Sequence, residues 1–185
     1  MKVNITVADE SHFKYIGKIV EMMEGSSKER GTTLAIRTPE YIRDKMENHK
    51  AIIAIDEGGN VAGFSYIETW SHTKFVANSG LTVAEPYRRN GLGRRIKKRI
   101  FELSREMYPY AKIFSITTQL SVMKINTELG FKPASFSELT DDKEFWEGCY
   151  GCANYDILQR NDCKICLCTA LLYDPKEHKQ DKTEK

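Results

Sequence analysis

EPYRRNGLGRR, residues 85–95, places two glycines and four arginines between an apolar stretch, SGLTVA, and a basic amphipathic stretch, IKKRIFELSREMY. The flanking patterns predict a strand before this turn and a helix after it. Glycine at positions 91 and 93 removes side chains where a ligand could approach the backbone, and the first turn of a helix presents unpaired N–H groups. Together with the arginines, these groups predict a site for a doubly charged anion such as pyrophosphate.

Two other phosphate-binding motifs do not match this turn. A dinucleotide-binding fingerprint needs a third glycine in a parallel strand–helix–strand unit, and a P-loop needs Gly-Lys followed by Ser or Thr. The turn contains neither pattern. The remaining structural alternative is a tight turn before a solvated basic helix.

Length and composition favour one compact domain. The chain has 185 residues and a hydrophobic fraction of 41%, which is enough for a single buried core. Its formal charge of +2 does not favour a nucleic-acid-binding surface. No apolar run is long enough for a membrane span or a signal peptide, so we expect a cytoplasmic protein with no membrane partner.

The hydrophobic pattern predicts alternating strands and helices in the order βααβββαβαββ. Strands are expected at 4–8, 50–56, 61–69, 75–85, 112–118, 131–137 and 165–174, and helices at 11–26, 38–49, 91–108 and 121–129. We expect one domain over residues 1–174, with a cysteine-rich insertion at about 138–164 between the last two strands. The charged segment 175–185 has little to bury and is expected to be disordered.

Two segments resemble motifs of the GNAT family of N-acetyltransferases. Arg88-x-x-Gly91-x-Gly93 resembles its motif A, and TELGFKP at 127–133 resembles the end of its motif B. The resemblance extends from Asn4 to about Asp174 and implies a mixed, mostly antiparallel sheet flanked by helices. It also implies acetyl-CoA as co-substrate, with its pantetheine arm along the strand and its pyrophosphate on the turn. The implied cofactor-binding residues are Leu81, Thr82, Val83, Arg88, Arg89, Asn90, Gly91, Leu92, Gly93 and Arg94.

The resemblance implies direct attack of a deprotonated amine on the thioester, without a covalent intermediate. Glu68 is the candidate that accepts the amine's proton, although a strand-end carboxylate can also be simply solvated. Where the family often has a tyrosine that protonates the departing thiolate, this chain has Asn126. The acid is then water, another tyrosine such as Tyr150 or Tyr155, or no side chain.

Three segments are similar, in order, to the acetyltransferase domain of bacterial N-acetylglutamate synthases: GTTLAIRTPEYIRDKM, ITTQLSVMKINTELGFKPASFSEL and YDILQR. This similarity implies a small amine acceptor, in particular an amino acid. Arg37 and Arg160 are the candidates that hold its carboxylate, because a guanidinium group pairs with a carboxylate through two parallel hydrogen bonds. The alternative is that both arginines lie on the surface.

Five cysteines lie in the last quarter of the chain. Cys149 and Cys152 form one C-x2-C pair, and Cys163 and Cys166 form another after ten intervening residues. This spacing suits a structural zinc ion held by four thiolates. Buried or free thiols are the alternative, and Cys168 is expected to be a buried strand residue.

Two classes of function are consistent with the sequence. The first is an N-acetyltransferase acting on a small amine. The second is a non-catalytic protein with the same fold, either an acyl-CoA sensor or a zinc-dependent interaction module. The sequence leaves open whether the protein is a monomer or a homodimer.

Overall fold

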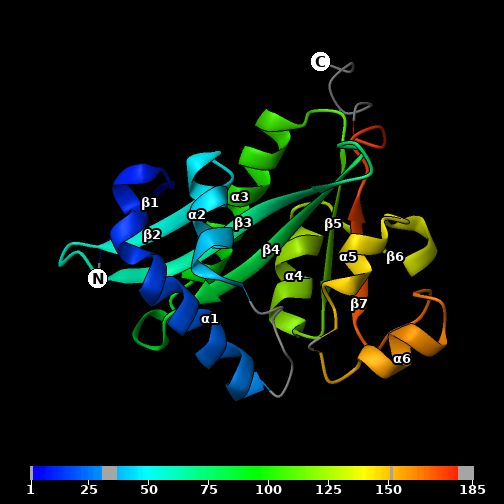
Figure 1. Cartoon of the computed structure of the whole chain (residues 1–185). Coiled ribbons are helices and arrows are strands. Elements are labelled where there is room, and N and C mark those ends of the chain that lie inside the picture. Colours follow the sequence, from blue (N-terminus) through cyan, green and yellow to red (C-terminus); the bar gives the residue numbers. More distant parts are fainter. Residues whose placement is uncertain (1, 31–36, 151, 179–185) are drawn as a thin grey trace, which may run out of the picture.

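The structure, a computed structural model, describes residues 2–30, 37–150 and 152–178 (Figure 1). Its centre is a seven-stranded sheet in the order β1-β2-β3-β4-β5-β7-β6. The strands are β1 Val3–Val7, β2 Ala51–Asp56, β3 Val61–Trp70, β4 Phe75–Val83, β5 Lys112–Thr117, β6 Lys132–Ala134 and β7 Thr169–Tyr173. The helices are α1 Ile16–Arg30, α2 Pro39–Glu47, α3 Leu92–Met107, α4 Leu120–Glu128, α5 Lys143–Glu147 and α6 Tyr155–Arg160.

The sequence-based order of strands and longer helices is confirmed, as is the mixed, mostly antiparallel sheet. The sequence did not predict the short helices α5 and α6, which lie between β6 and β7. The last strand also begins later than expected, at Thr169, because its partner residue Thr117 is the end of β5. Cys166 and Cys168 therefore precede the strand and are not part of it.

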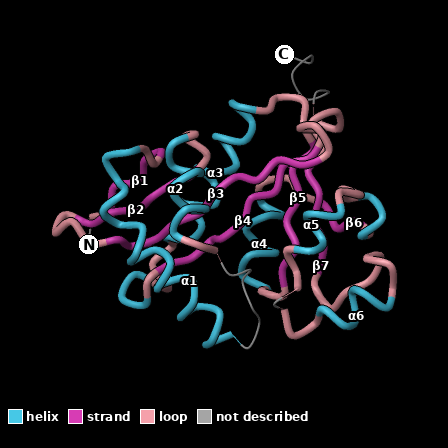
Figure 2. The backbone as a smooth tube through the Cα atoms, viewed as in Figure 1, coloured by secondary structure: helices cyan, strands magenta, loops and turns pink. Residues whose placement is uncertain are grey.

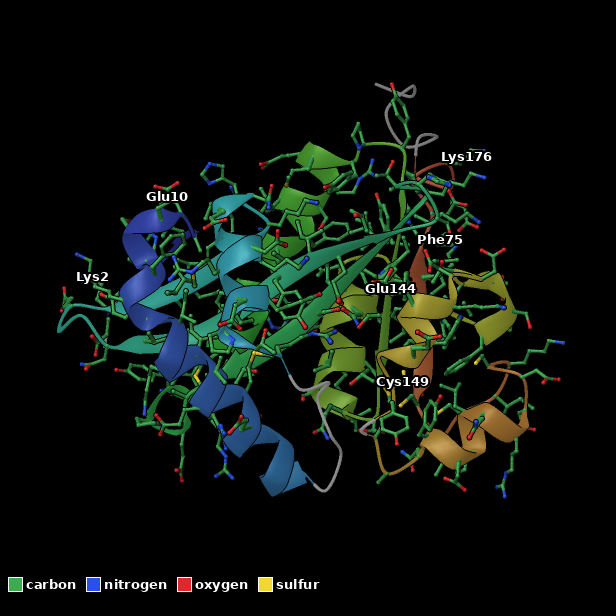
Figure 3. All side chains as sticks on the ribbon, in the orientation of Figure 1. Lys2, Glu10, Phe75, Glu144, Cys149 and Lys176 are labelled. Atoms are coloured by element: carbon green, nitrogen blue, oxygen red, sulfur yellow. The ribbon has the colours of Figure 1, made fainter. Side chains whose placement is uncertain are left out.

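The separation of β4 and β5 divides the sheet into a first part, β1 to β4, and a second part, β5, β7 and β6. The parallel strands β4 and β5 pair at Phe75–Ala77 and Lys112–Phe114, and no pairing follows beyond Ala77 and Phe114. Figure 2 shows the two strands close together at one end and apart at the other, and Phe75, labelled in Figure 3, lies at the paired end. The gap leaves residues 79–81 of β4 partly exposed.

Helices cover both faces of the first part of the sheet. Residues of β2 alternate between two apolar clusters: Ile52 and Ala54 pack with Ile96 of α3, whereas Ala51 and Ile53 pack in the cluster that contains α1 and α2. Because side chains of a strand alternate between faces, this double burial accounts for the continuous apolar run of β2. Helix α3 is thereby fixed on the face opposite α1 and α2.

The insertion packs on the second part of the sheet. Trp146 of α5 and Leu158 of α6 join Phe114 of β5 and Ala170 of β7 in a third apolar cluster. The Trp146 indole donates to the carbonyl of Thr140 at 2.9 Å, which satisfies its buried N–H group. The insertion is thus attached to the sheet beside the open end of the gap.

The end of the described chain follows β7. Residues 175–178 form a turn, in which the His178 ring stacks on Tyr173 at 4.3 Å between ring centres and Glu177 pairs with Lys132 at 2.8 Å. Residues 179–185 lie outside the described residues, so the expected disorder is not tested there. Within the described ranges, no helix is long and apolar enough to cross a membrane.

The contact between α3 and β3 gives a test of the fold. A Cβ atom at Gly63 would lie 2.5 Å from Ile96 Cδ1 and 2.9 Å from the Thr82 carbonyl oxygen. We expect Gly63→Ala to lower the free energy of unfolding by about 1–3 kcal/mol, because the backbone oxygen cannot move away cheaply. Gly17→Ala is the control, since a Cβ atom there meets nothing within 4 Å. In the control the helix should gain about 0.5–1 kcal/mol. Equal melting temperatures of the two variants would contradict this account.

Candidate active site

The glycine-rich turn has the backbone geometry of an anion site. Gly91 has φ 73° and is the N-cap of α3, and Arg89 also has positive φ, 64°. The first bond of the helix runs from Arg95 N to Gly91 O at 3.2 Å. The N–H groups of the preceding residues therefore point from the helix start toward solvent, where the helix dipole adds positive potential.

The arginines of the turn have different roles in the structure. Arg88 Nε donates to the Val83 carbonyl at 3.0 Å and ties the turn to the end of β4. Arg94 pairs with Glu128 of α4, and Arg95 donates to the Val3 carbonyl at 3.1 Å. Arg89 and Asn90 are exposed at the tip. The backbone therefore supplies most of the fixed geometry of the site, and the exposed guanidinium groups supply charge.

A cavity of about 420 Å³ occupies the gap between β4 and β5. The second half of β4 lines one side from Ala77 to Leu81, and β5 lines the other from Phe114 to Thr117. Glu144 and Cys149, labelled in Figure 3, line it from the insertion. Of the cofactor residues expected on β4, Leu81 lines this cavity, whereas Thr82 is buried and its hydroxyl donates to Gly80 O at 3.1 Å.

A bulge in β4 borders the cavity. The register with β3 shifts so that Phe64 pairs with Thr82 but Tyr66 pairs with Ser79, which leaves one extra residue on β4. Gly80 lies in this bulge with φ 65°, and a Cβ atom there would be 2.2 Å from the Tyr66 ring. Only glycine can adopt this positive φ and also leave room for the Tyr66 ring. The sequence analysis missed Gly80, although a glycine inside a strand pattern is a signal of a bulge.

Glu68 lies at the centre of a hydrogen-bonded network in the cavity wall. Its side chain is 5% exposed and lines the cavity. Glu68 Oε1 accepts from Arg37 Nη2 at 3.0 Å and from the Tyr41 hydroxyl, and Oε2 accepts from the Ser79 hydroxyl at 2.5 Å. These bonds compensate for the burial of the carboxylate. The simple solvated strand end considered from sequence is therefore wrong for this residue.

Arg37 joins the same network from the segment before α2. Its Nε donates to the Tyr66 hydroxyl at 2.8 Å, and its guanidinium carbon lies 4.6 Å from the centre of the Tyr41 ring. Burial, followed by the charge of Glu68, raises the pKa of both Tyr41 and Tyr66, so both hydroxyls stay protonated at neutral pH. The sequence analysis predicted Arg37 and Glu68 but missed the two tyrosines. Tyr66 and Glu68 are two residues apart on one strand, a spacing that places them on the same face.

Other predicted residues do not reach this cavity. Arg160 is exposed on α6, and Tyr155 borders a separate cavity of about 40 Å³ in the insertion. Tyr150 is 78% exposed. Asn126 is fully buried, and its side-chain amide has no hydrogen-bond partner among the described residues. The structure thus brings together Glu68 and Arg37, but neither Tyr155 nor Arg160.

All five cysteines are free thiols, and Cys149, Cys163, Cys166 and Cys168 pack against the third apolar cluster. Burial raises the pKa of Cys149 to about 11 and that of Cys168 to about 12. Within the described part of the chain, no three or more His, Cys, Asp and Glu residues form a group that could hold a metal ion. The four-thiolate zinc site at Cys149, Cys152, Cys163 and Cys166 stays a prediction, and packing in the third apolar cluster accounts for the partial burial of Cys149, Cys163 and Cys166.

Comparison with known proteins gives a family and several structural relatives. The family model described as Acetyltransferase (GNAT) family matches residues 19–129, which is more than half of the chain. The comparison with curated proteins gave no match.

Three solved structures illustrate the likeness of the fold. N-acetylglutamate synthase from Neisseria gonorrhoeae, complexed with coenzyme A and N-acetyl-glutamate, has a TM-score of 0.64 and 19% identity, over 94% of this chain and 35% of that one. Rv2747 from Mycobacterium tuberculosis, in complex with CoA and NLQ, has a TM-score of 0.65 and 13% identity, over 92% of this chain and 98% of that one. A phosphinothricin acetyltransferase from Sinorhizobium meliloti, in complex with AcCoA, has a TM-score of 0.63 and 12% identity, over 94% of this chain and 89% of that one.

The chain spans about a third of the length of the synthase, so that likeness concerns one part of a longer protein. At these identities the structural matches show a shared fold. The family follows from the match over residues 19–129, which includes the glycine-rich turn, the gap between β4 and β5, and the Glu68 network. The chain belongs to the GNAT family of acetyl-CoA-dependent acetyltransferases.

Proposed function

We propose that this protein transfers the acetyl group of acetyl-CoA to the amino group of a small amino acid. The observation that carries the proposal is that a carboxylate and a guanidinium group, Glu68 and Arg37, line one cavity at the open gap between β4 and β5. A carboxylate suits a substrate ammonium group, and a guanidinium group suits a substrate carboxylate. An amino acid carries both groups on adjacent atoms.

The cofactor would extend from the glycine-rich turn into the gap. Its pyrophosphate would lie on the backbone N–H groups of residues 89–94, and its pantetheine arm along β4 at residues 81–83. This arrangement directs the thioester toward the bulge at Gly80. A bulge leaves one residue outside the strand ladder. Its backbone is therefore available to polarise the thioester carbonyl, as a hydrogen-bond donor does for a developing oxyanion.

Glu68 would bind the acceptor's ammonium group and accept its proton. A carboxylate has about four lone-pair positions. Three of these positions accept hydrogen bonds from Arg37, Tyr41 and Ser79. Among the hydrogen bonds between described residues, Oε2 accepts only the one from Ser79. The amine can therefore bind Oε2 directly. After the proton has left, the amine nitrogen attacks the thioester carbonyl carbon, and the carbon–sulfur bond breaks.

Arg37 would hold the acceptor's carboxylate. Its bonds to Tyr66 and Glu68 use two of the five N–H groups of a guanidinium. Glu144 also lines the cavity and would repel a second carboxylate on the acceptor. Much of the remaining wall is aromatic, from Trp70, Phe114 and Phe145. These features favour a monocarboxylic amino acid with an apolar side chain over glutamate.

An acceptor screen tests this proposal. Purified protein is incubated with acetyl-CoA and matched pairs of substrates, each amino acid beside the amine that lacks its carboxylate, and released CoA is separated by chromatography. The proposal expects faster turnover of the amino acid in each pair and poor turnover of aspartate and glutamate. Acetyl-CoA binding without turnover of any amine would favour the non-catalytic alternative.

The role of Arg37 is tested by the same pairs. We expect Arg37→Met to reduce kcat/KM for the amino acid by roughly 10- to 150-fold, which corresponds to about 1.5–3 kcal/mol for a hydrogen bond to a charged group. The matched amine should lose much less, because it has no carboxylate to bind. An equal loss for both members of a pair would show that Arg37 acts only by supporting Glu68.

The role of Glu68 is tested by Glu68→Gln, which keeps the size of the side chain and removes the base. We expect kcat to fall roughly 100-fold or more, the loss typical of a missing general base. Glu57→Gln is the matched control, since Glu57 is 72% exposed in the turn between β2 and β3. An unchanged kcat in Glu68→Gln would assign deprotonation to solvent.

The cofactor site is tested at Gly93. A Cβ atom there meets only Val83 Cγ2, at an ordinary 3.6 Å, so the unliganded fold accepts a side chain. We expect Gly93→Leu to weaken acetyl-CoA binding at least tenfold, about 1.4 kcal/mol, because the side chain occupies the space of the pyrophosphate. Gly25→Leu on α1 is the control, with no atom within 4 Å of the added Cβ. Calorimetry with equal affinities for both variants would argue against this site.

A further inference from the structure

Lys97 of α3 is a buried amine in the wall of the cavity. The residue is 1% exposed and borders the gap between β4 and β5. Its Nζ donates to the Asn78 carbonyl at the long distance of 3.5 Å and lies 5.7 Å from the centre of the Phe131 ring. A lysine is almost never fully buried without a charged partner. Within the described residues, no carboxylate forms an ion pair with it.

Burial lowers the pKa of Lys97 to about 7. No charged neighbour contributes to this shift, although several titratable groups face the same cavity from other elements. The charged ones are Arg37, Glu68 and Glu144, and the neutral ones are Tyr41, Tyr66 and the thiols of Cys149, Cys152 and Cys168. Near neutral pH, both the ammonium and the amine forms of Lys97 are therefore populated, as is required of a group that gives and receives protons.

Lys97 lies beside the proposed path of the cofactor. It lies six positions after Gly91 at the helix start, which is about 9 Å along the axis of α3. Asn78, the residue that accepts its hydrogen bond, is the first residue of β4 beyond the stretch paired with β5. The amine therefore lies on the inner side of the gap, where the thioester end of a cofactor bound at the turn would arrive.

The other proton-bearing groups of the cavity wall are less suited to protonate the leaving thiolate, because burial raises the pKa of Tyr41, Tyr66, Cys149 and Cys168. Asn126, at the position where the family often has a tyrosine, is a buried amide with no ionisable proton. Tyr155 borders a different cavity. The Ser115 hydroxyl lines the gap on β5 and is a rival side-chain candidate.

We propose that Lys97 donates the proton that converts the departing CoA thiolate into a thiol. This inference rests on the proposed acetyl transfer. When the carbon–sulfur bond breaks, its electron pair goes to sulfur, and sulfur takes a proton from the Lys97 ammonium group. The neutral amine then takes the second proton of the acceptor nitrogen, on which the new amide bond has formed. The ammonium group is thereby restored, and no external reactant is needed.

Lys97→Met tests this role, because methionine replaces the amine by an apolar chain of similar length. We expect kcat to fall roughly 100-fold, within the range for loss of a general acid. Lys98→Met is the matched control, with a side chain that is 67% exposed, and should keep wild-type kcat. Ser115→Ala tests the rival donor. Acetyl-CoA affinity, measured by calorimetry, should be unchanged in Lys97→Met.

The pH dependence separates a proton donor from a structural residue. The kcat of the wild type should decline as pH rises through the pKa of the bound enzyme's lysine, because the donor must be protonated. This descending limb should be absent in Lys97→Met. A limb that persists in Lys97→Met, a kcat within threefold of wild type, or a loss found in Ser115→Ala instead would overturn the proposal.

Stability gives a readout that does not depend on turnover. The folded pKa of about 7 lies below the ordinary value of 10.5, so the unfolded chain binds more protons between these values. The free energy of unfolding of the wild type should therefore rise with pH across this window, and the rise should be smaller in Lys97→Met. Identical pH slopes would show that Lys97 is not a neutral buried amine and would overturn the proposal. If the wild type turned over no amine at all, the proposed function would fail together with this inference, whereas normal turnover by Lys97→Met would remove the inference alone.

Discussion

β4 and β5 are paired at three residues of each strand and then separate, and the candidate site depends on that separation. Continued pairing would close the sheet and bury the backbone of residues 78–81. Two features maintain the gap. The bulge at Gly80 turns β4 away from a regular ladder, and α3 with its buried lysine lies along the opening. A parallel sheet ordinarily satisfies its backbone between strands, so an opening of this kind is stable only where side chains or a ligand replace the lost partners.

The Glu68 network supports the same opening from the other side. Tyr66 packs against the bulge through its ring and accepts from Arg37 through its hydroxyl, so one residue connects the shape of β4 to the charge of the site. Removal of one partner of a buried ion pair leaves the other charge uncompensated. Substitution of any residue of the network is therefore expected to disturb the other residues. The geometry of the network is held jointly by β3, β4 and the segment before α2.

Sequence patterns predicted the turn and the order of the elements, because both depend on local spacing, and the family resemblance pointed to Arg37 and Glu68. They missed Gly80, Tyr41 and Lys97, because these residues acquire their roles from contacts between distant segments. Lys97 in particular belongs to a basic helix pattern in which a lysine is normally solvated, and only the packing of α3 against the gap makes it buried. The cysteine spacing leaves the zinc site a prediction for the converse reason: paired spacing is local, but a metal site also requires that both pairs meet in the folded chain.

The two proton-handling groups proposed here differ in their environments. Glu68 accepts three hydrogen bonds from a guanidinium group and two hydroxyl groups, and its Oε2 can also accept one from an ammonium group. Lys97 has one long bond to a carbonyl group and no carboxylate partner, and its environment favours the neutral amine. An amine that readily gives up its proton suits a leaving thiolate, while a carboxylate that accepts hydrogen bonds suits an arriving cation. One cavity thus contains both of the environments that the proposed transfer from ammonium to thiolate requires.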